Sequence, residues 1–182
     1  MREHSRTMHG DIAVRAARDD DRAAIEERLR ESWRSTTIVS RGKSRDASRL
    51  PALLAVRGDD IVGLATFEVE GGECELVSIE AFHRQQGIGS ALLMQVAHEA
   101  RKRGCRRLWL ITTNDNVDAL RFYQRRGMRL VAVHRGAVDQ ARRIKPAISL
   151  AGDYGIPIHD ELELELRLDH DSGQPRCKDQ GA

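Results

Sequence analysis

Cysteine is scarce in this 182-residue chain, and the spacing of the cysteines matches neither a disulfide-rich domain nor a metal site. The three cysteines, Cys74, Cys105 and Cys177, lie far apart, with no Cys-x-x-Cys pair and no cysteine–histidine spacing typical of a metal site. The seven histidines are also scattered and form no His-Glu-x-x-His run. We therefore expect free thiols in a reducing compartment, no disulfide and no structural metal.

An excess of one charge and long apolar runs are missing as well. Lys and Arg number 30 against 28 Asp and Glu, a formal net charge of +2. The total charge therefore gives no argument for binding nucleic acid or a membrane surface. No segment approaches the length of a transmembrane helix, and the first ten residues lack the apolar stretch of a signal peptide. We expect a cytoplasmic protein with neither a nucleic-acid nor a membrane partner.

The remaining composition is that of a globular protein, with 40% hydrophobic and 32% charged residues but only 4% aromatic ones. A chain of this length suits a single domain. We assign a polar N-terminal extension to residues 1–10 and the folded domain to residues 11–169. Residues 170–182 form a polar tail that we expect to be disordered.

Apolar periodicity within the domain predicts an α/β fold. Alternating runs separated by glycine or aspartate turns predict strands over residues 12–15, 53–57, 61–70, 73–79, 108–111, 129–134 and 162–168. Helical spacing with start and stop signals predicts helices over residues 89–103 and 117–126. A further helix is predicted after the start signals at residues 19–21, with Ala24, Ile25, Leu29 and Trp33 in its amphipathic stretch. Residues 40–50 have no period and are predicted to form a loop, and residues 136–159 a long connection.

The sharpest local signal is Arg84-Gln-Gln-Gly87-Ile-Gly89-Ser90, between a predicted strand and a predicted helix. Glycine lets the backbone approach a ligand closely, and the first N–H groups of a helix have no internal partners. This segment could therefore hold a pyrophosphate, with a tight structural turn as the alternative. Leu92 stands where a Rossmann fingerprint has its third glycine, and no Gly-Lys-Ser/Thr follows to make a Walker A loop.

Two blocks of the chain together resemble the GNAT acetyltransferases. The first, Arg84-x-x-Gly87-x-Gly89, is similar to the family's Q/R-x-x-G-x-G/A motif. The second, Asn116-Val-Asp-Ala-Leu-Arg-Phe-Tyr123-Gln-Arg-Arg-Gly127-Met128, is similar to its N-x-x-A-x-x-F-Y-x-x-x-G-F segment, with Met128 in place of the usual Phe. The resemblance extends from about Ile12 to Leu168. It implies an α/β GNAT fold, a mixed, mostly antiparallel central sheet flanked by helices and splayed between its fourth and fifth strands, where coenzyme A enters.

The resemblance also implies a set of cofactor-binding residues for acetyl-coenzyme A. The backbone of Val77 and Ile79 would run along the pantetheine arm. The Val77 N–H would polarise the thioester carbonyl, a contribution of roughly 3 kcal/mol. Asn116 would hold the arm through its side chain, and a helix N-cap is a compatible alternative. The pyrophosphate end would be bound by Arg84 and by the backbone of Gln85, Gly87, Ile88, Gly89 and Ser90.

Tyr123 is the catalytic residue that the resemblance favours, and it would also contact the cofactor. A phenol beside the sulfur can protonate the departing thiolate, whereas a packing role next to Phe122 is the alternative. For a general base, Glu73 and Glu75 alternate onto one face of their predicted strand. Solvated strand charges, or proton removal through water, are the alternatives. Weaker candidates for the base are Glu68 and Glu80.

The resemblance implies an N-acetyltransferase that moves acetyl from acetyl-coenzyme A to a primary amine by direct attack in a ternary complex, and we expect no metal. The acceptor would be a small-molecule or peptide amine, chosen by the connection over residues 136–159. A homodimer would be compatible with the resemblance. The alternative is a non-catalytic module of the same fold, a sensor or interaction protein that binds acyl-coenzyme A and needs no proton donor at Tyr123.

Overall fold

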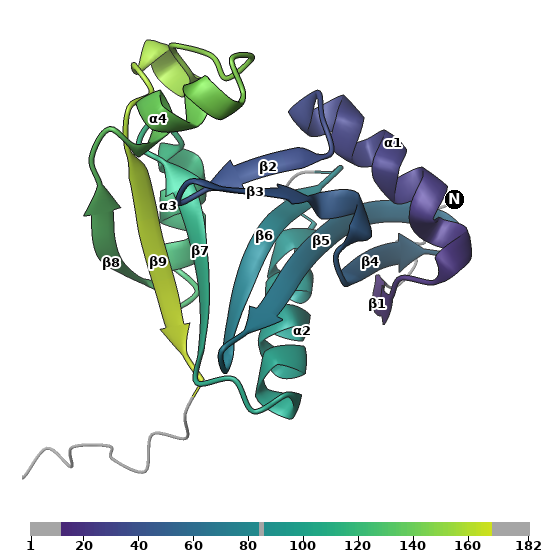
Figure 1. Cartoon of the computed structure of the whole chain (residues 1–182). Helices are drawn as coiled ribbons and strands as arrows, with labels where there is room; N and C mark the ends of the chain where they lie inside the picture. The colour runs from purple at the N-terminus through teal and green to yellow at the C-terminus, as the bar shows by residue number, and fades with distance from the viewer. Residues whose placement is uncertain (1–11, 84–85, 169–182) are drawn as a thin grey trace, which may run out of the picture.

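The computed structural model describes residues 12–83 and 86–168. The predicted extension 1–10, the predicted tail 170–182 and the motif residues Arg84 and Gln85 lie outside the described residues. Within the described ranges the chain forms a seven-stranded sheet, helices on both of its faces and a separate two-stranded hairpin (Figure 1). The predicted α/β class is confirmed.

The elements begin and end close to the predicted residues. The strands of the sheet are β1 (Ala13–Ala16), β4 (Ala52–Arg57), β5 (Asp60–Glu70), β6 (Glu73–Ala81), β7 (Arg107–Thr113), β8 (Arg129–His134) and β9 (Glu161–Arg167). The hairpin strands are β2 (Thr37–Ser40) and β3 (Lys43–Asp46). The α-helices are α1 (Arg22–Trp33), α2 (Ile88–Lys102), α3 (Val117–Gln124) and α4 (Ala137–Ile144). None of these helices is long and apolar enough to cross a membrane.

The sheet is mixed but mostly antiparallel, as predicted. Its spatial order is β1-β4-β5-β6-β7-β9-β8, and β6 and β7 are its fourth and fifth strands in chain order. These two strands run parallel and pair only from Glu73–Arg107 to Leu76–Leu110. Beyond that point they diverge, while β7 continues to pair with β9 up to Thr113. The predicted splay between the fourth and fifth strands is therefore confirmed.

A β-bulge in β6 marks the point of divergence. Leu76 lies opposite Phe67 of β5 and Ser78 lies opposite Thr66, so Val77 is an extra residue on β6. A bulge bends its strand and increases the local twist. The buried hydroxyls of Thr66 and Ser78 lie 2.7 Å apart and are hydrogen-bonded just past the bulge. The bulge thus turns β6 away from β7 while β6 stays paired with β5.

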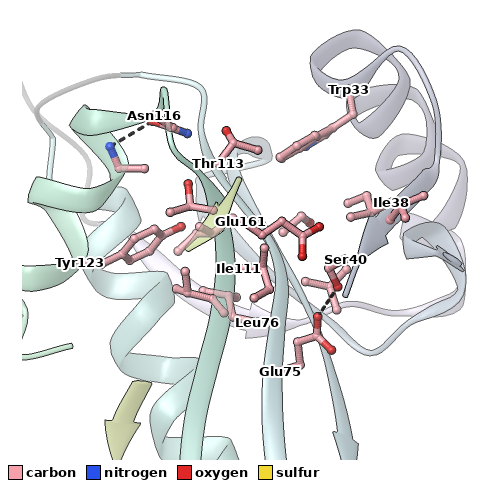
Figure 2. A pocket seen from close by; sticks show the side chains of 17 residues that line it. Trp33, Ile38, Ser40, Glu75, Leu76, Ile111, Thr113, Asn116, Tyr123 and Glu161 are labelled. Carbon is pink, nitrogen blue, oxygen red and sulfur yellow. Dashed lines mark hydrogen bonds between the residues drawn. The ribbon is translucent and has the colours of Figure 1, made fainter. Parts of the chain in front are cut away.

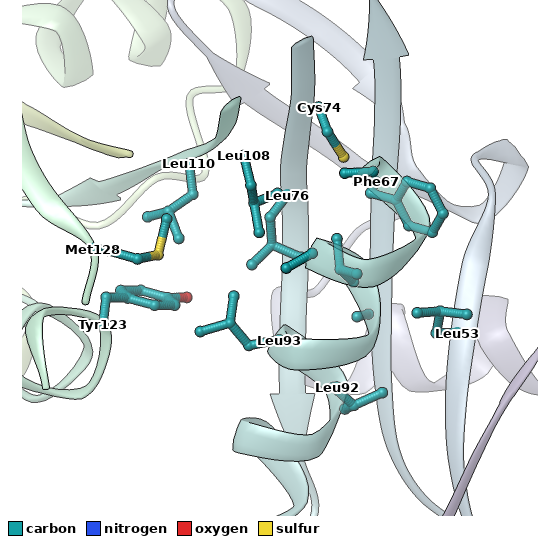
Figure 3. Close-up of a cluster of buried hydrophobic side chains, with 14 of the residues drawn as sticks. Leu53, Phe67, Cys74, Leu76, Leu92, Leu93, Leu108, Leu110, Tyr123 and Met128 are labelled. Atoms are coloured by element: carbon teal, nitrogen blue, oxygen red, sulfur yellow. The ribbon is translucent and has the colours of Figure 1, made fainter. Parts of the chain in front are cut away.

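Apolar cores on both faces of the sheet fix the positions of the helices. The face toward α2 buries a large cluster that includes Leu92, Leu108 and Leu164, with Tyr123 and Met128 at one side (Figure 3). Met128 is buried, so the residue that departs from the family pattern still fills an apolar site. On the opposite face, Ile25 and Leu29 of α1 pack against the β4–β5 pair. Both cores fix the position of β6 beside the space that opens where β6 and β7 diverge.

The prediction of a loop over residues 40–50 is wrong, because part of this segment forms the β2–β3 hairpin. Thr37 pairs with Asp46 and Ser40 with Lys43, around a turn at Arg41 and Gly42 that has positive φ at both residues. Ile38 of β2 packs into the α1-side core, and β3 is attached to the sheet by ion pairs, which leave no apolar alternation in its sequence. These ion pairs join Lys43 and Arg45 to Glu68, Glu70 and Glu75.

The long connection over residues 136–159 contains regular structure. It begins with α4, which buries Val138 and Ala141, and includes a 3-10 turn at Asp153–Gly155. The Nζ of Lys145 donates a hydrogen bond of 2.8 Å to the carbonyl of Thr37 in β2. The connection therefore braces the hairpin from the side away from the sheet (Figure 1).

Candidate active site

A cavity of about 230 Å³ opens where β6 and β7 diverge (Figure 2). Its walls come from the ends of these two strands, from β2, from the first turns of α3 and from the start of β9. The cavity lies beneath the hairpin that sequence reasoning missed. The predicted site residues that line it are Glu75, Val77, Ile79, Asn116 and Tyr123.

The N-terminus of α2 has the properties expected of a phosphate cradle. Gly87 is the N-cap with φ +77°, a conformation that favours glycine. The helix's first turn contains no acidic residue, and none of the described side chains caps it. The first N–H groups, those of Ile88, Gly89 and Ser90, therefore lie at the positive end of the helix dipole without intrahelical acceptors. These residues fit the pyrophosphate of coenzyme A.

Gly89 has a second reason to be glycine. A Cβ built on it would lie 3.1 Å from Cζ of Phe122, closer than ordinary packing. The side chain of Phe122 is thereby packed directly against the first turn of α2. The two sequence blocks of the resemblance are in contact through this pair, which explains why a glycine and an aromatic residue occur together.

Arg126 is a candidate cofactor-binding residue that sequence reasoning missed. Its guanidinium donates to Oγ of Ser90 through Nε at 2.9 Å and Nη2 at 2.6 Å, and it stacks 3.6 Å above the Phe122 ring. A cation is thus held beside the uncapped start of α2, where it would add to the field on a phosphate. The motif gives no signal for it, because Arg125 and Arg126 look equivalent in sequence.

The diverging stretch of β6 has the properties needed for the pantetheine arm. Val77 and Ile79 line the cavity and lie past Leu76, the last β6 residue paired with β7. An extended ligand can hydrogen-bond to such an exposed strand as an added strand does. Asn116 stands across the cavity as the N-cap of α3, accepting from the Ala119 N–H at 3.1 Å. The N-cap prediction is confirmed, and the amide nitrogen of Asn116 is not used by that cap.

Tyr123 presents its hydroxyl to the same cavity. The residue is only 8% exposed, and its ring packs edge-on against Phe122. Among the described residues no group is hydrogen-bonded to the hydroxyl. Burial raises the pKa of Tyr123, so the phenol keeps its proton near neutral pH. It can therefore act as a proton donor but not as a base.

The two carboxylates predicted to share a strand face have different surroundings. Glu75 lines the cavity, is 4% exposed, and accepts from Ser40 Oγ at 2.7 Å and from Arg45. Burial raises the pKa of Glu75, opposed by Ser40 and Arg45. Glu73 forms an ion pair of 2.9 Å with Arg107, which lowers the pKa of Glu73, and it does not line the cavity.

The two weaker candidates for a base are also engaged elsewhere. Glu68 bonds to Arg45 at 2.7 Å and to Lys43, and these contacts lower its pKa. Glu80 accepts from Ser32 and Trp33 at the end of α1, and burial raises its pKa. Neither side chain reaches the cavity.

Glu161, the first residue of β9, is a cavity carboxylate that sequence reasoning missed. It is 3% exposed, and its Oε2 accepts from the backbone N–H of Arg41 at 2.9 Å. Burial raises the pKa of Glu161. Its sequence, an alternation of glutamate with leucine, is typical of a strand whose charged face meets solvent. The hairpin covers that face, which is why the alternation gave no sign of a buried site.

A second cavity, of about 380 Å³, is also lined by Glu161. It is bounded by the hairpin turn, the end of β8 and the start of α4, with Arg41, His134 and Arg135 as its basic residues. The connection over residues 136–159 contributes Ala137 and Gln140 to this second cavity and nothing to the first. Over the described ranges, no group of three or more His, Cys, Asp and Glu side chains could hold a metal ion.

A protein-family model matches the part of the chain that contains most of the fold. Residues 14–128, from the first strand through the bulge and both motif blocks, match the family model described as "Acetyltransferase (GNAT) family". The chain belongs to the GNAT family. This GNAT protein is accordingly an acetyltransferase that uses acetyl-coenzyme A.

Relatives of this GNAT protein include two from Bacillus subtilis (strain 168). It is 40% identical to the uncharacterized protein YxbD over 137 residues, which cover 75% of this chain and 86% of YxbD. It is 46% identical to the uncharacterized protein YdhI over 110 residues, 60% of this chain and 69% of YdhI. A shorter match, 35% over 79 residues, joins 41% of this chain to 42% of a streptothricin acetyltransferase from Streptomyces lavendulae.

Solved structures share the GNAT fold at low sequence identity. An IAA acetyltransferase from Bacillus cereus ATCC 14579 has a TM-score of 0.66 at 19% identity, covering 86% of this chain and 99% of that one. A GNAT family acetyltransferase from Elizabethkingia anophelis with acetyl-CoA bound has a TM-score of 0.62 at 17% identity, covering 86% and 97%. At this identity the likeness supports the architecture, including the splayed sheet.

Proposed function

We propose that this GNAT protein transfers acetyl from acetyl-coenzyme A directly to a primary amine of a small molecule, with both substrates bound at once. The observation that carries the proposal is the joint lining of one cavity. An unpaired strand edge for the thioester arm, a protonated phenol and a buried carboxylate face the same space. A pure binding module has no need of the last two.

The residues of this chain divide the work of the reaction among them. Acetyl-coenzyme A supplies the activated acyl group. The first turn of α2 and Arg126 bind the phosphates, and the backbone of Val77 and Ile79 aligns the arm. The Val77 N–H donates to the carbonyl oxygen as charge develops there, an effect worth roughly 3 kcal/mol. Tyr123 holds a proton at its hydroxyl for the thiolate that leaves.

A covalent acyl-enzyme does not fit the described cysteines. Burial raises the pKa of Cys74 to about 12 and raises that of Cys105, so neither thiol is ionised near neutral pH. Neither residue lines either cavity. Direct attack by the amine is therefore the favoured route.

The acceptor is proposed to be a small cationic amine. The match to a streptothricin acetyltransferase supports this class. The cavity supports it independently, because both of its ionisable side chains besides Tyr123 are carboxylates, Glu75 and Glu161. Streptothricin is accordingly the first acceptor to test.

The test is release of free thiol from acetyl-coenzyme A over a panel of streptothricin, diamines, amino acids and peptides, with a reaction lacking acceptor as background. We expect release above background with at least one small cationic amine, and an acetylated product by mass spectrometry. If acetyl-coenzyme A binds but no amine accelerates thiol release, the non-catalytic module is the better description.

A further inference from the structure

Glu161 lies where a substrate amine would have to be held. It lines the cavity shared with Tyr123 and with the unpaired edge of β6, and it lines the second cavity as well. It is fixed at the start of β9, where its backbone pairs with Thr113 and His134. In Figure 2 its side chain extends into the space between Tyr123 and the hairpin. A carboxylate on two paired strands is held more firmly than one on a loop.

The hydrogen bonds of Glu161 leave one oxygen without a partner. Oε2 accepts from the Arg41 N–H, whereas Oε1 has no donor within residues 12–83 and 86–168. Oε1 is not one of the fully buried side-chain atoms without a partner, so it faces the open space of the cavity. Both oxygens of Glu75 are engaged, Oε1 by Ser40 and Oε2 by Arg45. Glu75 therefore fastens the hairpin, and Glu161 keeps an acceptor site for a ligand.

Charge inside the cavity favours a cation at that site. As far as the described lining extends, it contains no Lys, Arg or His side chain. The charge of Glu75 is balanced by Arg45, with which it forms a buried ion pair. The neighbouring acid on β9, Glu163, is hydrogen-bonded to His134 at 2.9 Å and ion-paired with Arg107 at 3.1 Å. Glu161 thus supplies the uncompensated negative charge of the cavity.

The groups that face Glu161 from the hairpin and from β8 do not neutralise it. Arg41 contacts Oε2 through its backbone, while its guanidinium lies over Trp109 and 3.8 Å from Glu163. His134 of β8 lowers the pKa of Glu161 in company with Arg41, but burial has the larger opposite effect. Tyr123 faces the cavity from α3 as a neutral phenol.

We propose that Glu161 binds the acceptor's ammonium group and accepts the proton that the group loses, an inference that rests on the proposed amine acetylation. Oε1 takes one proton from the ammonium, and the freed nitrogen lone pair forms the bond to the acetyl carbon. The carbon–sulfur bond breaks, Tyr123 gives its proton to the departing thiolate, and the second proton of the attacking nitrogen passes to solvent water as the amide forms. After release of the products, water returns a proton to Tyr123 and takes one from Glu161, so the turnover yields amide, thiol and one proton.

The same charges define the class of acceptor. With no cation in the lining, a carboxylate placed directly beside the reacting amine would be desolvated next to Glu161 without a partner. The acceptor amine is therefore one that carries no adjacent carboxylate. Alaninamide and alanine differ in that group alone and form a matched pair of probes. We expect kcat/KM to be at least about 10-fold higher for alaninamide, the scale of a modest charge–charge effect.

The decisive variant is Glu161→Gln, which keeps the shape and the Arg41 contact but removes the proton acceptor. We expect kcat/KM for the acceptor to fall by about 100-fold or more. In wild type, log kcat/KM should rise with pH as Glu161 ionises. This rising part of the pH profile, the acidic limb, should be absent in Glu161→Gln. Glu165→Gln is the matched control, because Glu165 is on the same strand, pairs with Arg107 at 3.0 Å and lines neither cavity.

The outcomes separate the two proposals. Suppose that the wild-type enzyme acetylates an amine and that Glu161→Gln keeps more than about half of its kcat/KM, or keeps the rise of log kcat/KM with pH. Either result would overturn the role of Glu161 and leave the proposed function standing. Equal or better turnover of alanine would overturn the acceptor class, as would failure of both probes beside an active streptothricin reaction. A wild-type protein that binds acetyl-coenzyme A calorimetrically but acetylates no amine would refute the proposed function, and this inference with it.

Discussion

The attachment of the hairpin over the active site depends on Arg45, and its removal should destabilise the protein in a pH-dependent way. The Arg45 side chain is 9% exposed and bonds to Glu75, to Glu68 at 2.7 Å and to Ser40 at 2.9 Å. Arg45→Met keeps the aliphatic volume but leaves the Glu75 carboxylate buried without its cation. Breaking a buried ion pair from one side costs about 3–5 kcal/mol. In a domain of this size that corresponds to roughly 6–20 °C in Tm.

The pH dependence follows from the remaining carboxyl. Burial already raises the pKa of Glu75, and loss of Arg45 would raise it further above the value of about 4.3 in the unfolded chain. The folded state then binds the additional proton, so the cost appears as pH rises through the folded pKa and disappears below the unfolded one. Differential scanning calorimetry at about pH 8 and about pH 4 should give a large and a small decrease in Tm, respectively.

A double variant tests whether the unpaired Glu75 carboxylate is the source of the lost stability. Arg45→Met with Glu75→Gln removes both charges and should recover most of the stability lost in Arg45→Met at about pH 8. If Arg45→Met lowers Tm equally at both pH values, or if the double variant is no more stable than the single one, Glu75 is not the source of the cost. Glu161→Gln serves as control for removing a cavity carboxylate without touching the hairpin.

Three further predictions concern the cofactor and the proton donor. Acetyl-coenzyme A should raise Tm in a thermal shift assay while NAD and ATP do not, and Gly89→Val should abolish the shift with its circular dichroism unchanged, because the new side chain meets Phe122. Arg126→Ala should weaken calorimetric binding of acetyl-coenzyme A about 10- to 150-fold, the range for a lost charge-assisted hydrogen bond, and unchanged affinity would remove Arg126 from the site. Tyr123→Phe should bind acetyl-coenzyme A normally while kcat falls about 100-fold, and retention of more than half of kcat, with chemistry limiting, would rule out the proton donor.

Local patterns were sufficient where local forces decide the structure. The apolar spacing of α2 and the alternation of β5 and β6 fix their own elements, and the glycines before and within the first turn of α2 mark a backbone that must approach a ligand. The N-cap at Asn116 was also readable, because a cap forms within four consecutive residues.

The rest depends on contacts between segments distant in sequence. The hairpin has one polar strand, β3, held by ion pairs to β5 and β6, and β2 adds only the buried Ile38, so no local alternation marks it. Glu161 looks like any other solvent-facing glutamate of β9 until Arg41, from a segment some 120 residues earlier in the chain, covers it. Glu73 and Glu75 share a strand face, yet only the second reaches the cavity, because Arg107 holds the first.

The bulge at Val77 determines which kinds of inherited change this active site can tolerate. Before the bulge, the even-numbered residues Cys74 and Leu76 face the α2-side core. After the bulge the odd-numbered Ile79 faces it, because Val77 is one extra residue in the strand. Substituting Val77 alters a side chain but preserves that count. Deleting its codon would restore a regular ladder with β5, keep Ser78 and Ile79 on their present faces, remove the bend and favour pairing of β6 with β7 along the gap. Lineages of this protein should therefore vary in side chain at this position far more readily than in length.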